Sequence, residues 1–304
     1  MNKITFEGVD LELERVPCRV CGEEDQRPFM TEMRHGLDLS TVICTNCGLF
    51  YSSPRFTDKA TAIFYERLYP AFHGRTDGVT EEWQAKTKKD GEPRVKTLEE
   101  FLPKDADATV VEIGSGGGGF LTAATARTNW KLIGIEPGIQ QVEHMRARGL
   151  DVRHTPFEEV DFTELAPRAI VLFHVFEHLN HPMDFLAAAR AALPEDGILY
   201  LEVPDLAHST TRLREFLQAP HVYNFTSITL RNTLRLGGFE VRWLRERGNR
   251  LSMIATPGPV GQLEKWDIDA FVSRLRERER VLRAAELIPA KSVLRKVRGI
   301  IASV

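Results

Sequence analysis

The stretch that decides the fold is Val110–Phe120, which reads VVEIGSGGGGF. A short apolar run with one glutamate leads into five glycines within six positions. Apolar runs of this length form buried strands, and glycines allow a sharp turn that a ligand can approach closely. The pattern predicts a strand, a ligand-binding turn and a helix that begins on the glycines. Three ligands compete for the turn: a pyrophosphate, a nucleoside triphosphate, and a molecule that binds a carboxylate.

The glycine spacing alone does not choose among these ligands. Gly114, Gly116 and Gly119 satisfy the dinucleotide pattern G-x-G-x-x-G, which is weak evidence by itself. Phe120 stands where a nucleoside triphosphate loop needs a phosphate-binding lysine, so that loop is excluded.

Two glutamates near the turn are more informative than the glycines. Glu112 precedes the first glycine by two residues, and its carboxylate would repel a pyrophosphate but attract an ammonium group. Glu136 ends the second expected strand, where a carboxylate can accept hydrogen bonds from both ribose hydroxyls. The ligand should therefore carry a ribose and an amine but no phosphate. S-adenosylmethionine fits these three requirements.

The rest of the chain alternates strands with helices, which predicts an α/β fold with a doubly wound, mostly parallel sheet of seven strands. The last step is a helix followed by two strands, which implies an antiparallel edge. The expected strands are 108–114, 130–137, 150–156, 169–175, 197–205, 240–247 and 251–257.

All four cysteines lie near the start of the chain, at Cys18, Cys21, Cys44 and Cys47. Two C-x-x-C pairs, each followed by glycine, supply four thiolates for a tetrahedral zinc site. A disulfide pair is the alternative, which a reducing cytoplasm disfavours, and a redox motif would need only one pair. Because protein atoms take all four positions, this zinc should stabilise a small module over residues 1–56.

Three segments resemble, in order, the motifs of class I S-adenosylmethionine-dependent methyltransferases: VVEIGSGGGGF, GIEPG and LFHVFEHLNHP. The closest branch carries H-V-x-E-H-L after the fourth strand and includes many small-molecule and sugar methyltransferases. The segment from VPCRVCG to VICTNCGLFYSSPRF resembles the zinc-ribbon-like module that precedes such domains in sugar methyltransferases. The resemblance implies a Rossmann-like methyltransferase domain over 95–258, preceded by a helical linker or lid over 57–94.

The resemblance also implies a substrate and a set of site residues. The substrate would be a sugar, nucleotide-linked or in a glycan, or a related small molecule, methylated on oxygen or carbon. Another small metabolite, or an RNA modified with the help of the zinc module, is the alternative. The implied cofactor-binding residues are Glu112, Gly114, Ser115, Gly116, Gly118, Glu136, Pro137, Phe157, Phe173 and His174. Tyr69 and Tyr223 are candidates for hydrogen bonds to the substrate.

Three histidines compete for the role of base in methyl transfer. His221 lies in PHVYNFT, which resembles the E-H-x-x-x-F-S stretch of sugar methyltransferases that contains a catalytic histidine, although Pro220 replaces the acid here. We predict His221 as the base and His174 as the second candidate. His178 is predicted to be structural and to bond the backbone. The stretch HVFEH also matches an inverted zinc-protease pattern. That pattern needs both histidines on one helix face, whereas His174 is expected to complete a strand, so a protease is not predicted.

Charge and hydropathy limit the partners. The net charge of the chain is −3. In the first 56 residues, the acidic residues of segments such as DLELER and GEEDQR balance or exceed the cations, so nucleic-acid binding by this module is not expected. The chain start has no signal-peptide core, and no apolar run reaches the roughly 20 residues of a membrane span, which predicts a cytoplasmic location.

The last segment, 259–304, is expected to form basic amphipathic helices. Residues 271–304 hold nine lysines and arginines against three glutamates, a net charge of +6. Val293, Val297 and Ile300 repeat at helical spacing. Such a helix packs on its own domain or on a second subunit, or it lies at an anionic membrane surface.

Overall fold

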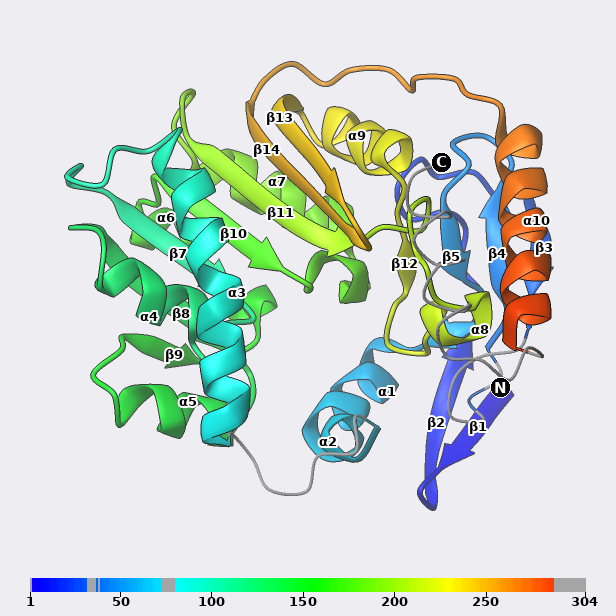
Figure 1. The fold of residues 1–304 in the computed structure, drawn as a ribbon, viewed down its shortest axis with the longest axis horizontal. Coiled ribbons are helices and arrows are strands. Elements are labelled where there is room, and N and C mark those ends of the chain that lie inside the picture. Colours follow the sequence, from blue (N-terminus) through cyan, green and yellow to red (C-terminus); the bar gives the residue numbers. More distant parts are fainter. Residues whose placement is uncertain (1, 32–36, 38, 73–79, 287–304) are drawn as a thin grey trace.

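The predicted parallel sheet is the centre of the fold (Figure 1). Its seven strands lie in the order β13-β14-β11-β10-β7-β8-β9. The computed structural model describes residues 2–31, 37, 39–72 and 80–286. The strands are β7 (Thr109–Ile113), β8 (Lys131–Glu136), β9 (Val152–His154), β10 (Ala169–Phe173), β11 (Ile198–Pro204), β13 (Phe239–Arg247) and β14 (Arg250–Pro257).

The strand order places a ligand crevice at one edge of this sheet. Strands β7 to β11 are parallel, whereas β14 is antiparallel to both β11 and β13. The predicted antiparallel edge is thus a hairpin in which β14, the later strand, pairs with β11. After β9 the chain crosses to the other side of β7 and forms β10. The carboxyl ends of β7 and β10 therefore diverge at a switch point, where α/β sheets bind ligands.

Helices cover both faces of the sheet because alternate strand residues point to opposite sides. Val110 of β7 belongs to one apolar cluster with residues of α3 and α4, and its neighbour Val111 belongs to another cluster with residues of α7 and α9. The helices over the sheet are α3 (Glu81–Glu99), α4 (Gly119–Thr125), α5 (Ile139–Arg146), α6 (Phe162–Leu165), α7 (Pro182–Ala192) and α9 (Ser227–Leu236). Helix α8 (Leu213–Phe216) instead packs in the apolar cluster of the N-terminal module.

Helix α3 crosses α4 at very short range. A Cβ atom added to Gly91 of α3 would lie 2.5 Å from the carbonyl oxygen of Gly119, the first residue of α4. A Cβ atom added to Gly119 would in turn lie 2.3 Å from the carbonyl group of Thr87, one turn earlier in α3. The absence of side chains at this crossing lets α3 reach the glycine turn, so a helix from outside the alternating pattern borders the predicted ligand site.

The first 56 residues form two small antiparallel sheets beside the carboxyl edge of the main sheet (Figure 1). One has the order β1-β2-β6 and the other β12-β5-β4-β3, so β12 joins this module from far along the chain. The strands are β1 (Asn2–Phe6), β2 (Val9–Glu14), β3 (Gln26–Met30), β4 (Thr41–Cys44), β5 (Phe50–Ser52), β6 (Arg55–Phe56) and β12 (Tyr223–Asn224).

Short helices connect this N-terminal module to α3. Helix α1 (Asp58–Ile63) is capped by Thr57, whose side chain accepts a hydrogen bond from the Ala60 amide. A π-helical turn (Phe64–Leu68) and α2 (Tyr69–Phe72) follow directly. These elements lie opposite the carboxyl ends of β10 and β11 (Figure 1).

The C-terminal helix α10 (Ile268–Glu286) packs against the N-terminal module (Figure 1). The Trp266 indole donates to the Cys47 carbonyl at 3.1 Å, and the rings of Phe271 and Phe50 lie 5.9 Å apart. This part of the predicted amphipathic segment thus packs on its own chain, while the stripe from Val293 onward lies outside the described residues. Within the part of the chain that the structure describes, every helix is too short or too polar to cross a membrane.

Candidate active site

The glycine turn after β7 has the shape that the sequence predicts. Gly114, Gly116 and Gly118 have φ angles of 66°, 53° and 70°, in the left-handed region that favours glycine. A Cβ at Gly114 would also lie 2.5 Å from a methyl group of Val175, so the turn packs directly against the loop after β10. The buried Ser115 hydroxyl donates to the Glu112 carbonyl at 3.1 Å and fixes the strand end.

The two predicted acidic residues lie on either side of this turn. Glu136 accepts hydrogen bonds from the amides of Gly116 and Gly138, at 2.8 and 2.9 Å, and burial raises its pKa against these bonds. Glu112 is only 4% exposed, and its Oε2 atom has no hydrogen-bond partner among the residues that the structure describes. Burial, opposed by the charge of Arg94, raises the pKa of Glu112 to about 8. A buried carboxyl of this kind fits a ligand that brings a positive charge.

The remaining predicted cofactor residues are less closely grouped. The carbonyl of Pro137 accepts a hydrogen bond from His154 at 3.0 Å, beside Glu136. Phe173 is buried, with the Arg94 guanidinium 4.4 Å above its ring. Phe157 belongs to the apolar cluster on the other face of the sheet, where its ring lies 5.6 Å from another phenylalanine ring. Trp83 of α3, which sequence reasoning missed, lies against Gly116 and Gly117.

His174 follows β10 directly and lies between two buried carboxylates. Its backbone has a φ of 59°, and its ring nitrogens are 3.6 Å from Glu177 Oε1 and 3.3 Å from Glu202 Oε1. Burial lowers the pKa of His174, but the two carboxylates raise it more, to about 9. The imidazole is therefore protonated at neutral pH, which makes His174 a poor proton acceptor in this arrangement.

This raised pKa predicts a pH dependence of stability. Since the folded pKa of about 9 lies above the ordinary 6.5, the stabilising contribution of His174 is complete below pH 6.5 and disappears as the pH rises through 9. Thermal unfolding of the wild type and of His174→Gln, followed from pH 6 to pH 10, should show a difference that shrinks over this range. A difference that stays constant or grows with pH would contradict the assignment.

Glu202 connects the sheet to α3, and sequence reasoning missed its role. Arg94 Nη2 donates to Glu202 Oε1 at 2.5 Å, and the Ser252 hydroxyl donates to Oε2 at 3.1 Å. Burial raises the pKa of Glu202, but His174 and Arg94 lower it well below the ordinary range. The only signal in the sequence is a glutamate within the apolar run of β11, and its partner Arg94 lies 108 residues away.

A second group of polar residues lies beside His174. A carboxylate oxygen of Glu177 and one ring nitrogen each of His178 and His221 all lie within 4.8 Å of one another. Glu177 is 0% exposed, and within the described part of the chain neither of its carboxylate oxygens has a hydrogen-bond partner. The nearby histidines lower its pKa although burial raises it, so the carboxylate stays charged. The structure thus brings together the predicted base His221 and an acid that no sequence motif assigned to it.

His178 has the structural role that its position predicts. Its Nδ1 atom is 2.7 Å from the Pro220 carbonyl oxygen, which can only accept, so Nδ1 carries the proton. Its ring centroid lies 4.9 Å from that of His221 in an edge-to-face contact. This bond fixes the segment just before His221 relative to the loop after β10.

The two predicted substrate tyrosines have different environments. Tyr69 of α2 lies at the site, with its ring 6.4 Å from that of His178, and Tyr65 lies alongside with its hydroxyl buried. Tyr223 is only 1% exposed, and its hydroxyl donates to the Asn180 carbonyl at 3.4 Å. Strand β12 pairs with β5 and buries the Tyr223 ring between the two parts of the chain, so its substrate role stays a prediction.

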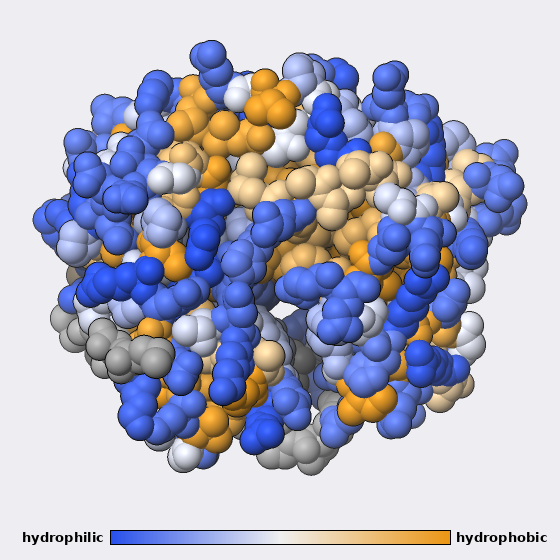
Figure 2. Space-filling model, turned by 180° about the vertical axis from the view of Figure 1, so that it is seen from behind, coloured by the Kyte–Doolittle hydropathy of each residue, from blue (hydrophilic) through white to orange (hydrophobic). Residues whose placement is uncertain are grey.

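One face of the molecular surface is hollowed. Seen from behind, the surface is hollowed near its centre, below a band of apolar residues and between polar rims (Figure 2). The main sheet lies on one side of this hollow and the N-terminal module on the other, as in the ribbon view (Figure 1).

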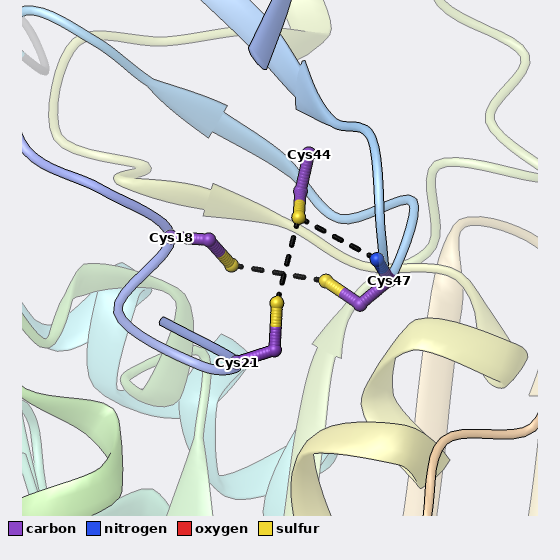
Figure 3. A group of neighbouring side chains, drawn as sticks. All are labelled: Cys18, Cys21, Cys44 and Cys47. Atoms are coloured by element: carbon purple, nitrogen blue, oxygen red, sulfur yellow. Dashed lines mark hydrogen bonds between the residues drawn. The ribbon is translucent and has the colours of Figure 1, made fainter. Parts of the chain in front are cut away.

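The four cysteines converge on one point in the N-terminal module (Figure 3). The sulfur atoms of Cys18 and Cys47 are 3.7 Å apart, and those of Cys21 and Cys44 are 3.5 Å apart. Disulfide bonds are excluded here, because the sulfurs of a disulfide lie about 2 Å apart. Four thiolates at about 2.3 Å from a tetrahedral zinc ion would lie about 3.8 Å from one another, so the cluster has the dimensions of a zinc site.

Comparison with known proteins agrees with this architecture. The sequence model of the family described as "Methyltransferase domain" matches residues 87–243. A probable S-adenosylmethionine-dependent methyltransferase of Mycolicibacterium smegmatis is 28% identical over 130 residues, which are 42% of this chain and 49% of that protein. The chain thus spans about half the length of this curated relative.

The chain is also similar to solved structures, at lower sequence identity. A methyltransferase of Aquifex aeolicus matches with 20% identity and a TM-score of 0.43 over 57% of this chain and 98% of that one. A methyltransferase of Mesorhizobium loti matches with 14% identity and a TM-score of 0.46 over 55% and 99%.

Proposed function

The chain belongs to the family of methyltransferase domains, and we propose that it transfers the methyl group of S-adenosylmethionine to a sugar or a related small molecule, with a histidine as the base. The observation that carries this proposal is the meeting of two sites at one edge of the sheet. The glycine turn with Glu112 and Glu136 lies beside the cluster of Glu177, His178 and His221.

The residues of the glycine turn suit this cofactor. The Glu112 carboxylate would hold the ammonium group, Glu136 the ribose, and the backbone of Gly114–Gly118 the methionine portion. The buried Oε2 atom of Glu112 is the feature that fits best, since it has no hydrogen-bond partner among the described residues and an ammonium group could donate to it. When bound, S-adenosylmethionine supplies a methyl group made electrophilic by its sulfonium.

Cofactor binding should release a proton from Glu112. With a pKa of about 8, this carboxyl is mostly protonated at pH 7, and a bound ammonium group would stabilise its charged form. Calorimetry with S-adenosylhomocysteine, which carries the same amine, should show most of one proton released at pH 7 when two buffers of different ionisation enthalpy are compared.

The matched variants separate Glu112 from other acids. Glu112→Gln should abolish the proton release, whereas Glu143→Gln on the exposed face of α5 should leave it unchanged. Equal apparent enthalpies in both buffers for the wild type would rule out this role of Glu112.

His221 is the better of the two predicted bases. His174 is protonated at neutral pH because Glu177 and Glu202 hold its charge, so it has no lone pair to offer. His221 shares the charged, buried carboxylate of Glu177, which favours an imidazole that gains a proton as the methyl group arrives. His174 then provides fixed positive charge between the two acids rather than proton transfer.

The sugar class rests on the polar character of the site and on its position next to the N-terminal module. The groups that line it are hydrogen-bonding ones: imidazoles, carboxylates and the phenols of α2 and the preceding turn. Hydroxyl-rich acceptors match such groups better than apolar metabolites do.

We propose Zn²⁺ as the occupant of the cysteine cluster, in a structural role. The S–S distances fit tetrahedral coordination, and four thiolates leave no open position for a substrate.

A panel of acceptors tests the proposal as a whole. Nucleotide-linked sugars, free sugars and glycans are incubated with S-adenosylmethionine and the purified chain, and mass spectrometry follows the gain of one methyl group. We expect methylation of at least one sugar at oxygen or carbon. Methyl transfer to RNA alone, or binding of NADH without binding of S-adenosylmethionine, would overturn it.

A further inference from the structure

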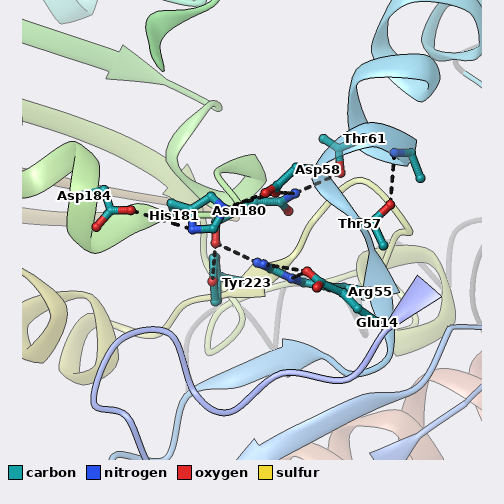
Figure 4. Close-up of polar contacts among 10 residues, drawn as sticks. Glu14, Arg55, Thr57, Asp58, Thr61, Asn180, His181, Asp184 and Tyr223 are labelled. Atoms are coloured by element: carbon teal, nitrogen blue, oxygen red, sulfur yellow. Dashed lines mark hydrogen bonds and ion pairs between the residues drawn. The ribbon is translucent and has the colours of Figure 1, made fainter. Parts of the chain in front are cut away.

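The most buried cation of the N-terminal module contacts the histidine loop of the proposed active site (Figure 4). Arg55 of β6 is 1% exposed. Its Nε and Nη2 atoms donate to Glu14 Oε1 at 3.1 and 3.0 Å. Its third nitrogen, Nη1, donates to the backbone carbonyl of Asn180 at 2.6 Å. One guanidinium thus joins the module to a loop 125 residues away.

Asn180 is held from its side chain as well. Its amide nitrogen donates to Asp58 Oδ1 at 2.8 Å and to the Thr61 hydroxyl at 3.0 Å, both on α1. The residue is 7% exposed, so these bonds are shielded from water. Residues that precede the parallel sheet thus hold both its backbone carbonyl and its side-chain amide, and the carbonyl also accepts a longer bond of 3.4 Å from the Tyr223 hydroxyl.

The position of Asn180 bears directly on the proposed chemistry. It follows His178 by two residues and Glu177 by three. Glu177 is the acid beside the proposed base, His221. His178 donates from Nδ1 to the carbonyl of Pro220, the residue before His221. A shift of the Asn180 backbone would move this short loop, and a displacement of about 1 Å at a reacting group can lower a rate roughly a hundredfold.

Both ends of the Arg55 contact are tied to the cysteine cluster. Glu14 precedes Cys18 by four residues, and Arg55 follows Cys47 by eight. Strand β5, which lies between Cys47 and Arg55, also pairs with β12 just after His221. The fold of the module therefore sets where the guanidinium points.

We propose that Arg55 is a positioning residue that couples the fold of the N-terminal module to the geometry of the histidine loop, residues 177–181. Arg55 acts through the Asn180 carbonyl and touches neither cofactor nor acceptor. This inference rests on the proposed function only where its test uses turnover.

Arg55→Lys is the decisive variant. A lysine keeps the positive charge, but a single ammonium group cannot replace the fork that spans Glu14 and the Asn180 carbonyl. We expect kcat to fall at least about tenfold, while KM for S-adenosylmethionine stays within about twofold. Arg27→Lys is the matched control, because Arg27 lies in the same module but pairs with Asp269 at the surface.

A second readout does not depend on activity. In the wild type, NMR of isotope-labelled histidine should show His178 with a proton on Nδ1, because Nδ1 bonds the Pro220 carbonyl. In Arg55→Lys this bond should weaken and the tautomers should mix. If Arg55→Lys does not fold, Glu14→Gln carries the test, with a smaller change in the same direction, because it leaves the guanidinium without its anionic partner.

The outcomes separate this inference from the proposed function. Wild-type turnover and an unchanged His178 tautomer in folded Arg55→Lys, or in Glu14→Gln where the lysine variant does not fold, would overturn the coupling. A wild type that methylates no acceptor would overturn the proposed function, and the His178 tautomer would still decide whether the coupling exists.

Discussion

Cys18→Ser is expected to remove one zinc ion per chain and to unfold the N-terminal module. Structural zinc contributes about 10–16 kcal/mol of apparent binding free energy, whereas a whole domain is stable by only about 5–15 kcal/mol. The two sheets of the module are small, and strands β5 and β6 have only three and two residues. Native mass spectra should show the loss of zinc, and limited proteolysis should cut within residues 1–56.

The damage should extend beyond the module. Strand β12 pairs with β5, and the Trp266 indole bonds the Cys47 carbonyl, so the segment after His221 and the start of α10 lose partners together. We therefore expect turnover to fall with the metal. Thr45→Ser, an exposed change between the two cysteines of the second pair, serves as the control. A wild type that carries no zinc, or that contains disulfides when freshly purified without reductant, would contradict the prediction.

The sequence predicts the main sheet well because its signals are local. Strands β7, β8, β10 and β11 are mostly apolar and mostly buried, and each ends at or just before a polar residue or a glycine. The glycine turn is predictable for the same reason: its left-handed residues need glycine wherever the chain makes that turn. Glu112 and Glu136 follow from their places at strand ends.

The state of the histidines could not be predicted in this way. The raised pKa of His174 depends on Glu202, which lies in the next strand, and the lowered pKa of Glu202 depends on Arg94 of α3. No spacing rule connects these three residues. The burial of Tyr223 could not be predicted for a similar reason, because β12 has two residues and no local pattern indicates its pairing with β5.

The approach of α3 to the glycine turn also depends on a distant match. Gly91 reads as an unfavourable residue inside a helix, yet it is the position at which α3 meets Gly119. Local propensity describes the cost of this glycine but not the contact that explains it.

His221→Ala should lower kcat by about a hundredfold or more while the affinity for S-adenosylmethionine stays almost unchanged. A hundredfold loss corresponds to about 2.7 kcal/mol of transition-state stabilisation, within the usual range for a general base. The cofactor affinity should persist because the glycine turn, Glu112 and Glu136 belong to other strands. Single-turnover methylation and calorimetry measure the two quantities separately.

Two further variants decide whether His221 acts with Glu177. The carboxylate of Glu177 favours the protonated imidazole, so Glu177→Gln should lower the pKa of the base and shift the acid limb of the kcat profile to lower pH. His144→Ala, a histidine of α5 bonded by Arg148, should leave both kcat and its pH profile unchanged. If His221→Ala keeps wild-type turnover, no proton acceptor is needed at this position, and the acceptor must already be nucleophilic, as an amine is. Loss of turnover together with an unshifted profile in Glu177→Gln would instead separate the two residues, with His221 acting alone.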